Sequence, residues 1–197
     1  MSTDLTDGSL PYRIAVLCYL RDADGKLLML HRSKPPNKGM YSPIGGKLEP
    51  TTGESPHRCA IRETQEETGL VLKPGEIRLM GMVSETAYEG ECHWLLFLFE
   101  ITRPVGHDEI IAYDMDEGTL EWLDRDRIDQ LDLPRTDRDI IWPLVAEYEG
   151  GFFACHIDCR NEPMTWDVLE SWKATRDSRP TSRAPTTGHQ ARQDRLH

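Results

Sequence analysis

The order of apolar and polar segments predicts a domain of mixed α/β or α+β class. Runs of β-branched and apolar residues recur along the chain, and a well-punctuated helix lies between them. The chain has 197 residues, of which 38% are hydrophobic and 29% are charged. These values suit a single globular domain with a modest core and terminal extensions.

Apolar runs separated by turn residues predict the strands. The first two cover residues 12–20 and 26–31, and the turn-forming Asp22-Ala23-Asp24-Gly25 between them predicts a hairpin. Further strands are predicted at residues 77–83, 93–102, 120–123 and, as the last of the domain, 151–158.

The clearest helix follows residue 55. Ser55 can cap its N-terminus, Pro56 suits its first position, and Gly69 suits the left-handed residue that ends it. Two other helices are predicted, a short acidic one at residues 124–131 and an amphipathic one at 137–148. In the latter, Pro143 falls early enough to be tolerated near the first turn.

The composition of the two ends differs from that of the centre. Residues 1–10 are polar and are predicted to be disordered, and residues 173–197 are predicted to form a disordered basic tail. The domain is placed at residues 11–160, followed by a C-terminal extension at 161–172. The tail carries a net charge of +4, whereas residues 1–172 hold 17 basic and 32 acidic residues, a net charge of −15.

Composition also excludes several classes of protein. The formal net charge of −11 argues against a nonspecific nucleic-acid coat. The longest apolar run, residues 94–99, is much shorter than the roughly 20 residues that span a bilayer, so no membrane partner is expected. No basic-then-apolar leader precedes Pro11, and the five cysteines lack regular spacing. These features predict a cytoplasmic protein with reduced thiols.

Three carboxylates share one face of the helix predicted after residue 55. Glu63, Glu66 and Glu67 stand at positions i, i+3 and i+4. Such an arrangement is electrostatically unfavourable, and a hard divalent cation such as Mg²⁺ would relieve the repulsion. A solvated acidic face is the alternative, but the glycine-rich stretch Gly45-Gly46 that leads into the helix favours a metal site.

Residues 46–70 resemble the Nudix box, the signature of the Nudix hydrolase family. That box reads Gly, five residues, Glu, seven residues, Arg-Glu, an apolar residue, any residue, Glu-Glu, any residue, Gly and an apolar residue. The matching residues are Glu54, Arg62, Glu63, Glu66, Glu67, Gly69 and Leu70. There are two departures: seven residues separate Gly46 from Glu54, as if Thr51-Thr52 were inserted, and Thr64 replaces an apolar residue.

The resemblance covers residues 12–160 and implies a Nudix-type α/β/α sandwich around mixed β-sheet. It also implies a metal-dependent site, in which Glu63 could position or deprotonate the attacking water, Glu54 would assist, and Arg62 would hold the glutamates in place. The implied ligands of Mg²⁺ (or Mn²⁺) are the Gly46 carbonyl, Glu63, Glu66, Glu67 and Glu117. Glu117 lies outside the box, and a surface acid in a loop is its alternative interpretation.

Five residues are candidates for substrate binding. Lys47 and Arg32 could meet phosphate oxygens, and Ser42 stands where related sanitising enzymes place an Asn against the base. Asp139, or its neighbour Asp137, could contact a purine edge. Tyr88 lies 18 residues after Leu70, in the window where a Tyr marks hydrolases of dinucleoside polyphosphates.

The implied activity is attack of water on phosphorus in a nucleoside diphosphate linkage. Trp122 and the segment around Pro143 resemble MutT-like enzymes, which favours a (d)NTP or oxidised (d)NTP cleaved to monophosphate and pyrophosphate. A dinucleoside polyphosphate hydrolase and a non-catalytic nucleotide-sensing regulator are the alternatives, whereas the Pro expected for ADP-ribose cleavage is absent from residues 84–87. The expected partner is a nucleotide substrate, and the chain is expected to be a monomer or homodimer.

Overall fold

A computed structural model describes residues 10–35 and 37–174. Within them the chain forms two α-helices, α1 (Pro56–Thr68) and α2 (Trp142–Glu147), together with short 3₁₀ segments. The strands in chain order are β1 (Tyr12–Tyr19), β2 (Leu27–Arg32), β3 (Tyr41–Ser42), β4 (Ile77–Tyr88), β5 (Cys92–Ile101), β6 (Asp114–Met115), β7 (Gly118–Leu123), β8 (Phe152–Asp158) and β9 (Thr165–Trp172).

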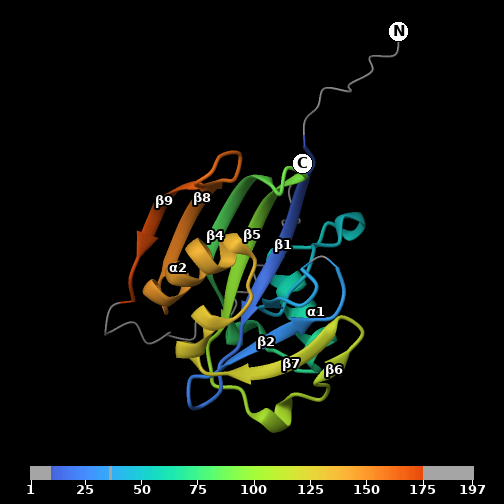
Figure 1. The fold of residues 1–197 in the computed structure, drawn as a ribbon. Helices are drawn as coiled ribbons and strands as arrows, with labels where there is room; N and C mark the ends of the chain where they lie inside the picture. Colours follow the sequence, from blue (N-terminus) through green and yellow to red (C-terminus); the bar gives the residue numbers. More distant parts are fainter. Residues whose placement is uncertain (1–9, 36, 175–197) are drawn as a thin grey trace, which may run out of the picture.

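The strands form two sheets. One has five strands in the order β1-β5-β4-β8-β9, with β1 parallel to β5, β4 parallel to β8, and the other pairs antiparallel. The other has four antiparallel strands in the order β3-β2-β7-β6. Figure 1 shows α2 in front of the larger sheet and α1 behind β1. The predicted α/β fold with mixed sheet and flanking helices is confirmed.

The alternation of side chains along β1 divides the core into two halves. Ala15 and Tyr19 pack with α2 and the inner residues of β8, whereas Val16 and Cys18 pack with α1 and β7. Successive residues of β2 divide in the same way. Strands β1 and β2 therefore stand between the two helices and bury side chains on both faces.

The predicted hairpin between the first two strands is wrong. The turn forms, because Asp22 Oδ1 accepts hydrogen bonds from the backbone N–H groups of Asp24 (2.9 Å) and Lys26 (2.8 Å). Beyond one bridge, however, β1 and β2 join different sheets. The edge of β1 is occupied instead by the glycine-rich loop, since Cys18 N–H donates to Ile44 O (2.7 Å) and Val16 N–H to Gly46 O (2.9 Å).

The main helix is confirmed with its predicted punctuation. Ser55 Oγ accepts from Arg58 N–H (3.3 Å), and Pro56 occupies the first turn. Gly69 ends the helix in the left-handed conformation, at φ 76°, and its N–H donates to Gln65 O (2.9 Å). These signals are local in sequence, so they set the helix ends independently of the rest of the fold.

Three other predictions need correction. Residues 124–131 contain a 3₁₀ helix at Arg125–Gln130. The amphipathic helix already begins at residue 135 and passes through a π turn at Asp137–Ile141 before α2. Pro143 therefore lies well inside this helical segment. Its nitrogen cannot donate a hydrogen bond, and the π turn lies directly before it. Strand β8 is not the last, because β9 pairs with it along its whole length.

The predictions of disorder for residues 1–10 and 173–197 fall almost entirely outside the described residues. Within the described residues, no helix has the length and apolar character needed to cross a membrane.

Replacing Gly45 by Ala is expected to destabilise the fold by about 2–4 kcal/mol. Gly45 has φ 149°, and a Cβ there would collide with the carbonyl of Val16, so the loop would have to leave the edge of β1. Urea unfolding measures the change. Gly75→Ala is the control, because no atom lies within 4 Å of its Cβ position. Equal stability of the two variants would contradict the proposed close approach.

Candidate active site

The loop that leads into α1 contains the two residues apparently inserted in the motif. Pro50–Thr52 form a 3₁₀ turn, capped by the Glu49 carboxylate, which accepts from Thr51 N–H (3.1 Å). Gly53 closes the turn at φ 62° in the left-handed region. Glu54 Oε2 then accepts from Glu49 N–H (3.1 Å). The extra length is thus taken up within the turn, and Glu54 still faces α1.

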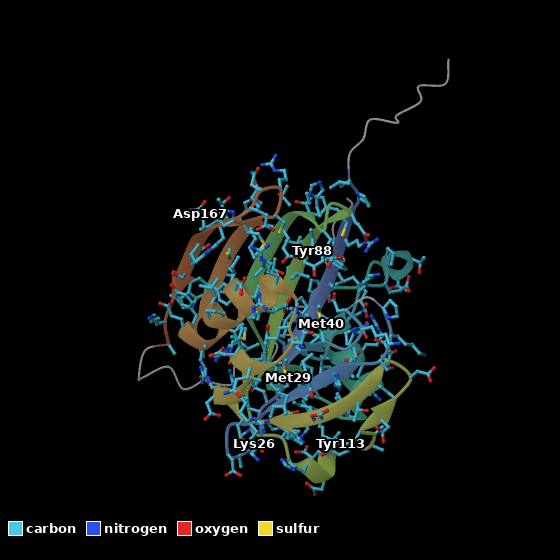
Figure 2. All side chains as sticks on the ribbon, viewed as in Figure 1. Lys26, Met29, Met40, Tyr88, Tyr113 and Asp167 are labelled. Carbon is cyan, nitrogen blue, oxygen red and sulfur yellow. The ribbon has the colours of Figure 1, made fainter. Side chains whose placement is uncertain are left out.

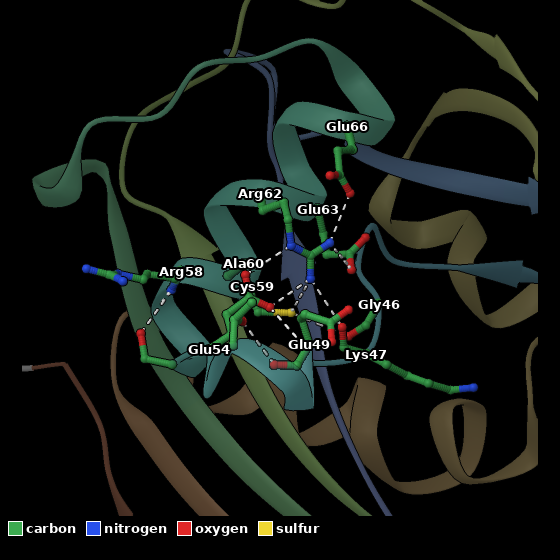
Figure 3. A network of polar contacts seen from close by, with 12 residues as sticks. Gly46, Lys47, Glu49, Glu54, Arg58, Cys59, Ala60, Arg62, Glu63 and Glu66 are labelled. Carbon is green, nitrogen blue, oxygen red and sulfur yellow. Dashed lines mark hydrogen bonds and ion pairs between the residues drawn. The ribbon is translucent and has the colours of Figure 1, made fainter.

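Arg62 joins the carboxylates of the site. Its Nε and Nη2 donate to Glu54 (3.0 and 2.8 Å), and its Nη1 donates to both Glu63 (2.7 Å) and Glu66 (2.9 Å). Nη2 also donates to the carbonyl of Lys47 (3.2 Å). Figure 3 shows the guanidinium at the centre of this network, between the loop and one face of α1. The bidentate pair with Glu54 fixes the orientation of the guanidinium plane.

The charges of this network act on one another. The hydrogen bonds from Arg62 lower the pKa of Glu54 from its usual 4.5 to about 2, and the hydrogen bonds to Glu54, Glu63 and Glu66 raise the pKa of Arg62. Burial, by contrast, raises the pKa of Glu63, although Arg62 opposes the effect. Glu54 is thus the carboxylate most strongly committed to Arg62.

Glu67 lies on the inner side of the same helix. It is buried, and its Oε2 accepts from Gly45 N–H (3.0 Å). Burial raises its pKa to about 8, and the nearby charges of Glu63 and Glu117 act in the same direction. A Cβ on Gly46 would collide with the Glu63 carboxylate. The absence of a side chain at Gly46 therefore leaves space for Glu63, whereas Glu67 is held by the Gly45 N–H.

Two residues from the smaller sheet reach this group. Glu117 lies in the turn between β6 and β7, and its Oε2 is 3.5 Å from Arg32 Nη2 at the end of β2. Both side chains act on the pKa of Glu67, Glu117 by raising it and Arg32 by lowering it. The structure therefore brings together the motif residues, Glu117 and Arg32.

Comparison with known proteins identifies the family. The NUDIX domain model matches residues 11–146. The chain belongs to the Nudix hydrolase family. Its class of activity is pyrophosphohydrolysis, and enzymes of this family typically use a divalent metal and a nucleotide-type substrate.

Individual relatives are distant. The chain is 30% identical over 128 residues to the uncharacterized Nudix hydrolase YvcI of Bacillus subtilis. The matched segment covers 63% of this chain and 73% of that protein. It is 31% identical over 110 residues to an ADP-ribose pyrophosphatase of Methanocaldococcus jannaschii, covering 56% and 61%. A mutator MutT protein from Bacillus halodurans has a similar structure, with a TM-score of 0.61, 26% identity, and coverage of 81% and 96%.

The residues of this Nudix site fit a hard divalent cation in their chemistry. The donors are carboxylates and a carbonyl, which are the oxygen ligands that Mg²⁺ prefers. Burial raises the pKa of both Glu63 and Glu67, and a bound cation would favour their ionised forms. Within residues 10–35 and 37–174, no three acidic, His or Cys side chains are arranged around one common point. Arg62 contacts Oε1 of Glu63 and Oε2 of Glu66, so the second oxygen of each carboxylate is the one that would ligate a metal.

The other residues predicted to bind substrate lie at different places in the Nudix domain. Lys47 is exposed, and its Nζ lies 6.0 Å from the centre of the Trp94 ring. Ser42 lies on β3, where it pairs with Leu30 of β2. Asp139 is engaged at the surface by Arg138 (2.8 Å) and is 3.7 Å from Arg135.

Tyr88 lies beyond the strand predicted at residues 77–83, but the structure extends that strand to include it. It is the last residue of β4 and is half-buried near the β4–β5 turn (Figure 2). Burial raises the pKa of its hydroxyl, and the neighbouring acids, Glu89, Asp137 and Glu85 among them, raise it further.

Glu85 is a buried acid that lies outside the elements predicted from the sequence. It is only 2% exposed, on the face of β4 that carries Val83. The signal was present, because Glu85 alternates with Val83 and so belongs to the buried face of a strand. The predicted strand, however, stopped at residue 83.

Replacing Glu54 by Gln is expected to destabilise the metal-free protein in a pH-dependent manner. The pKa of Glu54 is lower in the folded state, so its ionised form stabilises the fold fully above pH 4.5, and this contribution is lost as the pH falls towards about 2. Urea unfolding in the presence of chelator, from pH 7 to pH 3, measures the difference between wild type and variant.

We expect this difference to shrink as the pH falls below 4.5. Glu91→Gln, at an exposed position in the β4–β5 turn, is the control and should show little difference at any pH. A wild-type-to-E54Q difference that stays constant down to pH 3 would mean that the Arg62 pair does not lower the Glu54 pKa.

Proposed function

We propose that this Nudix hydrolase cleaves a (d)NTP or oxidised (d)NTP to the nucleoside monophosphate and pyrophosphate. The observation that carries the proposal is the group of carboxylates held by Arg62 and by the Gly45 N–H, with Arg32 beside it. Such a group suits metal-assisted attack of water on a phosphoric anhydride, a reaction that needs no covalent enzyme nucleophile.

The chain's own residues have distinct roles in the proposal. Glu63 holds the attacking water and accepts its proton, whereas Arg62, anchored by Glu54, positions Glu63 and Glu66. Arg32 and Lys47 bind phosphate oxygens. The residues that would hold Mg²⁺ (or Mn²⁺) are the Gly46 carbonyl, Glu63, Glu66, Glu67 and Glu117. When bound, the cation lowers the pKa of water and neutralises phosphate charge.

Two similarities support a nucleoside triphosphate as substrate. The region around Trp122 and Pro143 resembles MutT-like enzymes, and the solved structure with a TM-score of 0.61 is a mutator MutT protein. The acidic body of the enzyme makes divalent cations necessary for binding a polyphosphate, since residues 1–172 carry a net charge of −15.

ADP-ribose is a second candidate substrate. The 31% identity to an ADP-ribose pyrophosphatase supports it, although that match covers only 61% of the relative. Both candidates present a nucleoside diphosphate to the same carboxylates and differ in the group on the distal phosphate. Dinucleoside polyphosphates share that linkage too, and Tyr88 supports them only weakly because it is half-buried at the end of β4.

A substrate screen distinguishes these candidates. The enzyme is incubated with Mg²⁺ or Mn²⁺ and with (d)NTPs, oxidised dNTPs, dinucleoside polyphosphates, ADP-ribose or nucleotide sugars, and the products are separated by chromatography. Release of pyrophosphate together with a monophosphate supports the proposal. Turnover confined to ADP-ribose or dinucleoside polyphosphates would replace it, and tight binding without turnover of any compound would refute the assigned hydrolysis.

Replacing Glu66 or Glu67 by Gln is expected to lower metal-dependent kcat by ~100-fold or more, because each change removes an anionic metal ligand while keeping the side-chain volume. Steady-state kinetics across a Mg²⁺ titration measures the loss, and circular dichroism checks the fold. Glu91→Gln is the control for a general effect of removing negative charge. Full turnover in both ligand variants would disprove the assignment.

A further inference from the structure

A buried thiol lies inside the hydrogen-bond network of Arg62. Cys59 stands near the start of α1, at one of the seven positions that the Nudix box leaves open between Glu54 and Arg62. Its side chain is fully buried. Figure 3 shows its sulfur among Glu54, Arg62 and Gly46. The hydrolysis proposed above uses the residues around this thiol but not the thiol itself.

The thiol joins the helix to the glycine loop. Arg62 Nη2 donates to the Cys59 sulfur (3.4 Å), and the Cys59 S–H donates to the carbonyl of Gly46 (3.8 Å). The same carbonyl accepts Val16 N–H from β1 (2.9 Å), so each of its two lone pairs has a donor. The carbonyl proposed as a metal ligand is therefore held from two sides, by the sheet and by the helix.

The thiol has a second possible acceptor. The Glu54 carboxylate is also a hydrogen-bond partner of Cys59. A thiol carries one proton and so donates to one of these acceptors at a time. Burial, together with the negative charges of Glu63 and Glu54, raises the pKa of the thiol to about 12, so the proton stays on sulfur at neutral pH. Cys59 is thus a single donor placed between the Gly46 carbonyl and the Glu54 carboxylate.

We propose that Cys59 is a positioning residue of the active site, whose S–H holds the Gly46 carbonyl in the absence of a cation and turns to Glu54 when that carbonyl ligates the cation. The inference rests on the proposed function, in which the Gly46 carbonyl is a metal ligand. Val16 N–H keeps its hydrogen bond in both states, so the lone pair that the thiol releases is the one that becomes available.

The exchange of acceptors favours metal binding. A hydrogen bond to an ionised acceptor is roughly twice as strong as one to a neutral acceptor, so the thiol gains when it moves from Gly46 to Glu54. Glu54 is ionised at neutral pH, because its pKa is about 2. An alanine in place of Cys59 offers no such gain and no longer links the loop to the helix. Arg62 Nη2 would still donate to Glu54 and to the carbonyl of Lys47.

The first test measures metal affinity without turnover. Cys59→Ala is expected to weaken Mn²⁺ binding about two- to tenfold, the effect of one typical hydrogen bond. Electron paramagnetic resonance of Mn²⁺ measures the change. Cys18→Ala is the matched control, because Cys18 is also fully buried but its thiol donates to the Ala60 carbonyl (3.8 Å) instead of the loop. Both variants should lower the melting temperature, whereas only C59A should lose Mn²⁺ affinity.

The second test follows the S–H groups by infrared spectroscopy, since the S–H stretch lies in a region free of other protein bands. The band that disappears in C59A should move to lower wavenumber when Mg²⁺ is added to wild type, because the carboxylate is the stronger acceptor. The band that disappears in C18A should stay in place. In Glu54→Gln, at saturating Mg²⁺, the Cys59 band should move less, because a neutral amide oxygen replaces the carboxylate.

Three results would overturn the role of Cys59 and leave the proposed function standing. They are a Cys59 band that does not respond to saturating Mg²⁺, a C59A variant with the Mn²⁺ affinity of wild type, and a band shift that is undiminished in E54Q.

Failure of the proposed function gives a different pattern. If wild type cleaves no triphosphate but binds Mn²⁺ and shows the band shift, the substrate is refuted and the role of Cys59 stands. If wild type binds no Mn²⁺, the assigned metal ligands and the role of Cys59 are refuted together.

Discussion

The active site depends on the hydrogen bonds from the Arg62 guanidinium to the surrounding carboxylates. Glu54, Glu63 and Glu66 all accept hydrogen bonds from this one guanidinium, so three negative charges are concentrated in a small volume. A lysine could not replace Arg62 here, because only the planar fork donates to three carboxylates and a carbonyl in fixed directions. Arg62 therefore acts as a permanent internal cation that holds the carboxylates in position.

The glycine loop connects this site to the fold. By pairing with β1, residues 44–47 prevent β1 and β2 from continuing as a hairpin, so that the two strands enter different sheets. The same backbone donates Gly45 N–H to Glu67 and leaves space for Glu63 at Gly46. One loop thus sets the division between the sheets and the position of two carboxylates, which explains why its glycines cannot carry side chains.

The parts predictable from the sequence are those fixed by short-range chemistry. The ends of α1 follow from Ser55 and Gly69, and the shared face of its glutamates follows from helical spacing. The pairing of the glycine loop with β1 depends on contacts between distant residues and could not be predicted from local turn chemistry. Glu85 is different, because its alternation with Val83 places it on the buried face of β4, but the predicted strand ended at residue 83.

The acids behind the net charge of −11 have different surroundings in different parts of the domain. Around Arg62 the negative charge has a cation from the chain, and metal would supply the rest. At Glu85 and Asp137 burial raises the pKa of each carboxyl, and no cationic side chain opposes it. A buried acid pair without a cation destabilises a fold, so apolar residues at these positions would give a more stable domain.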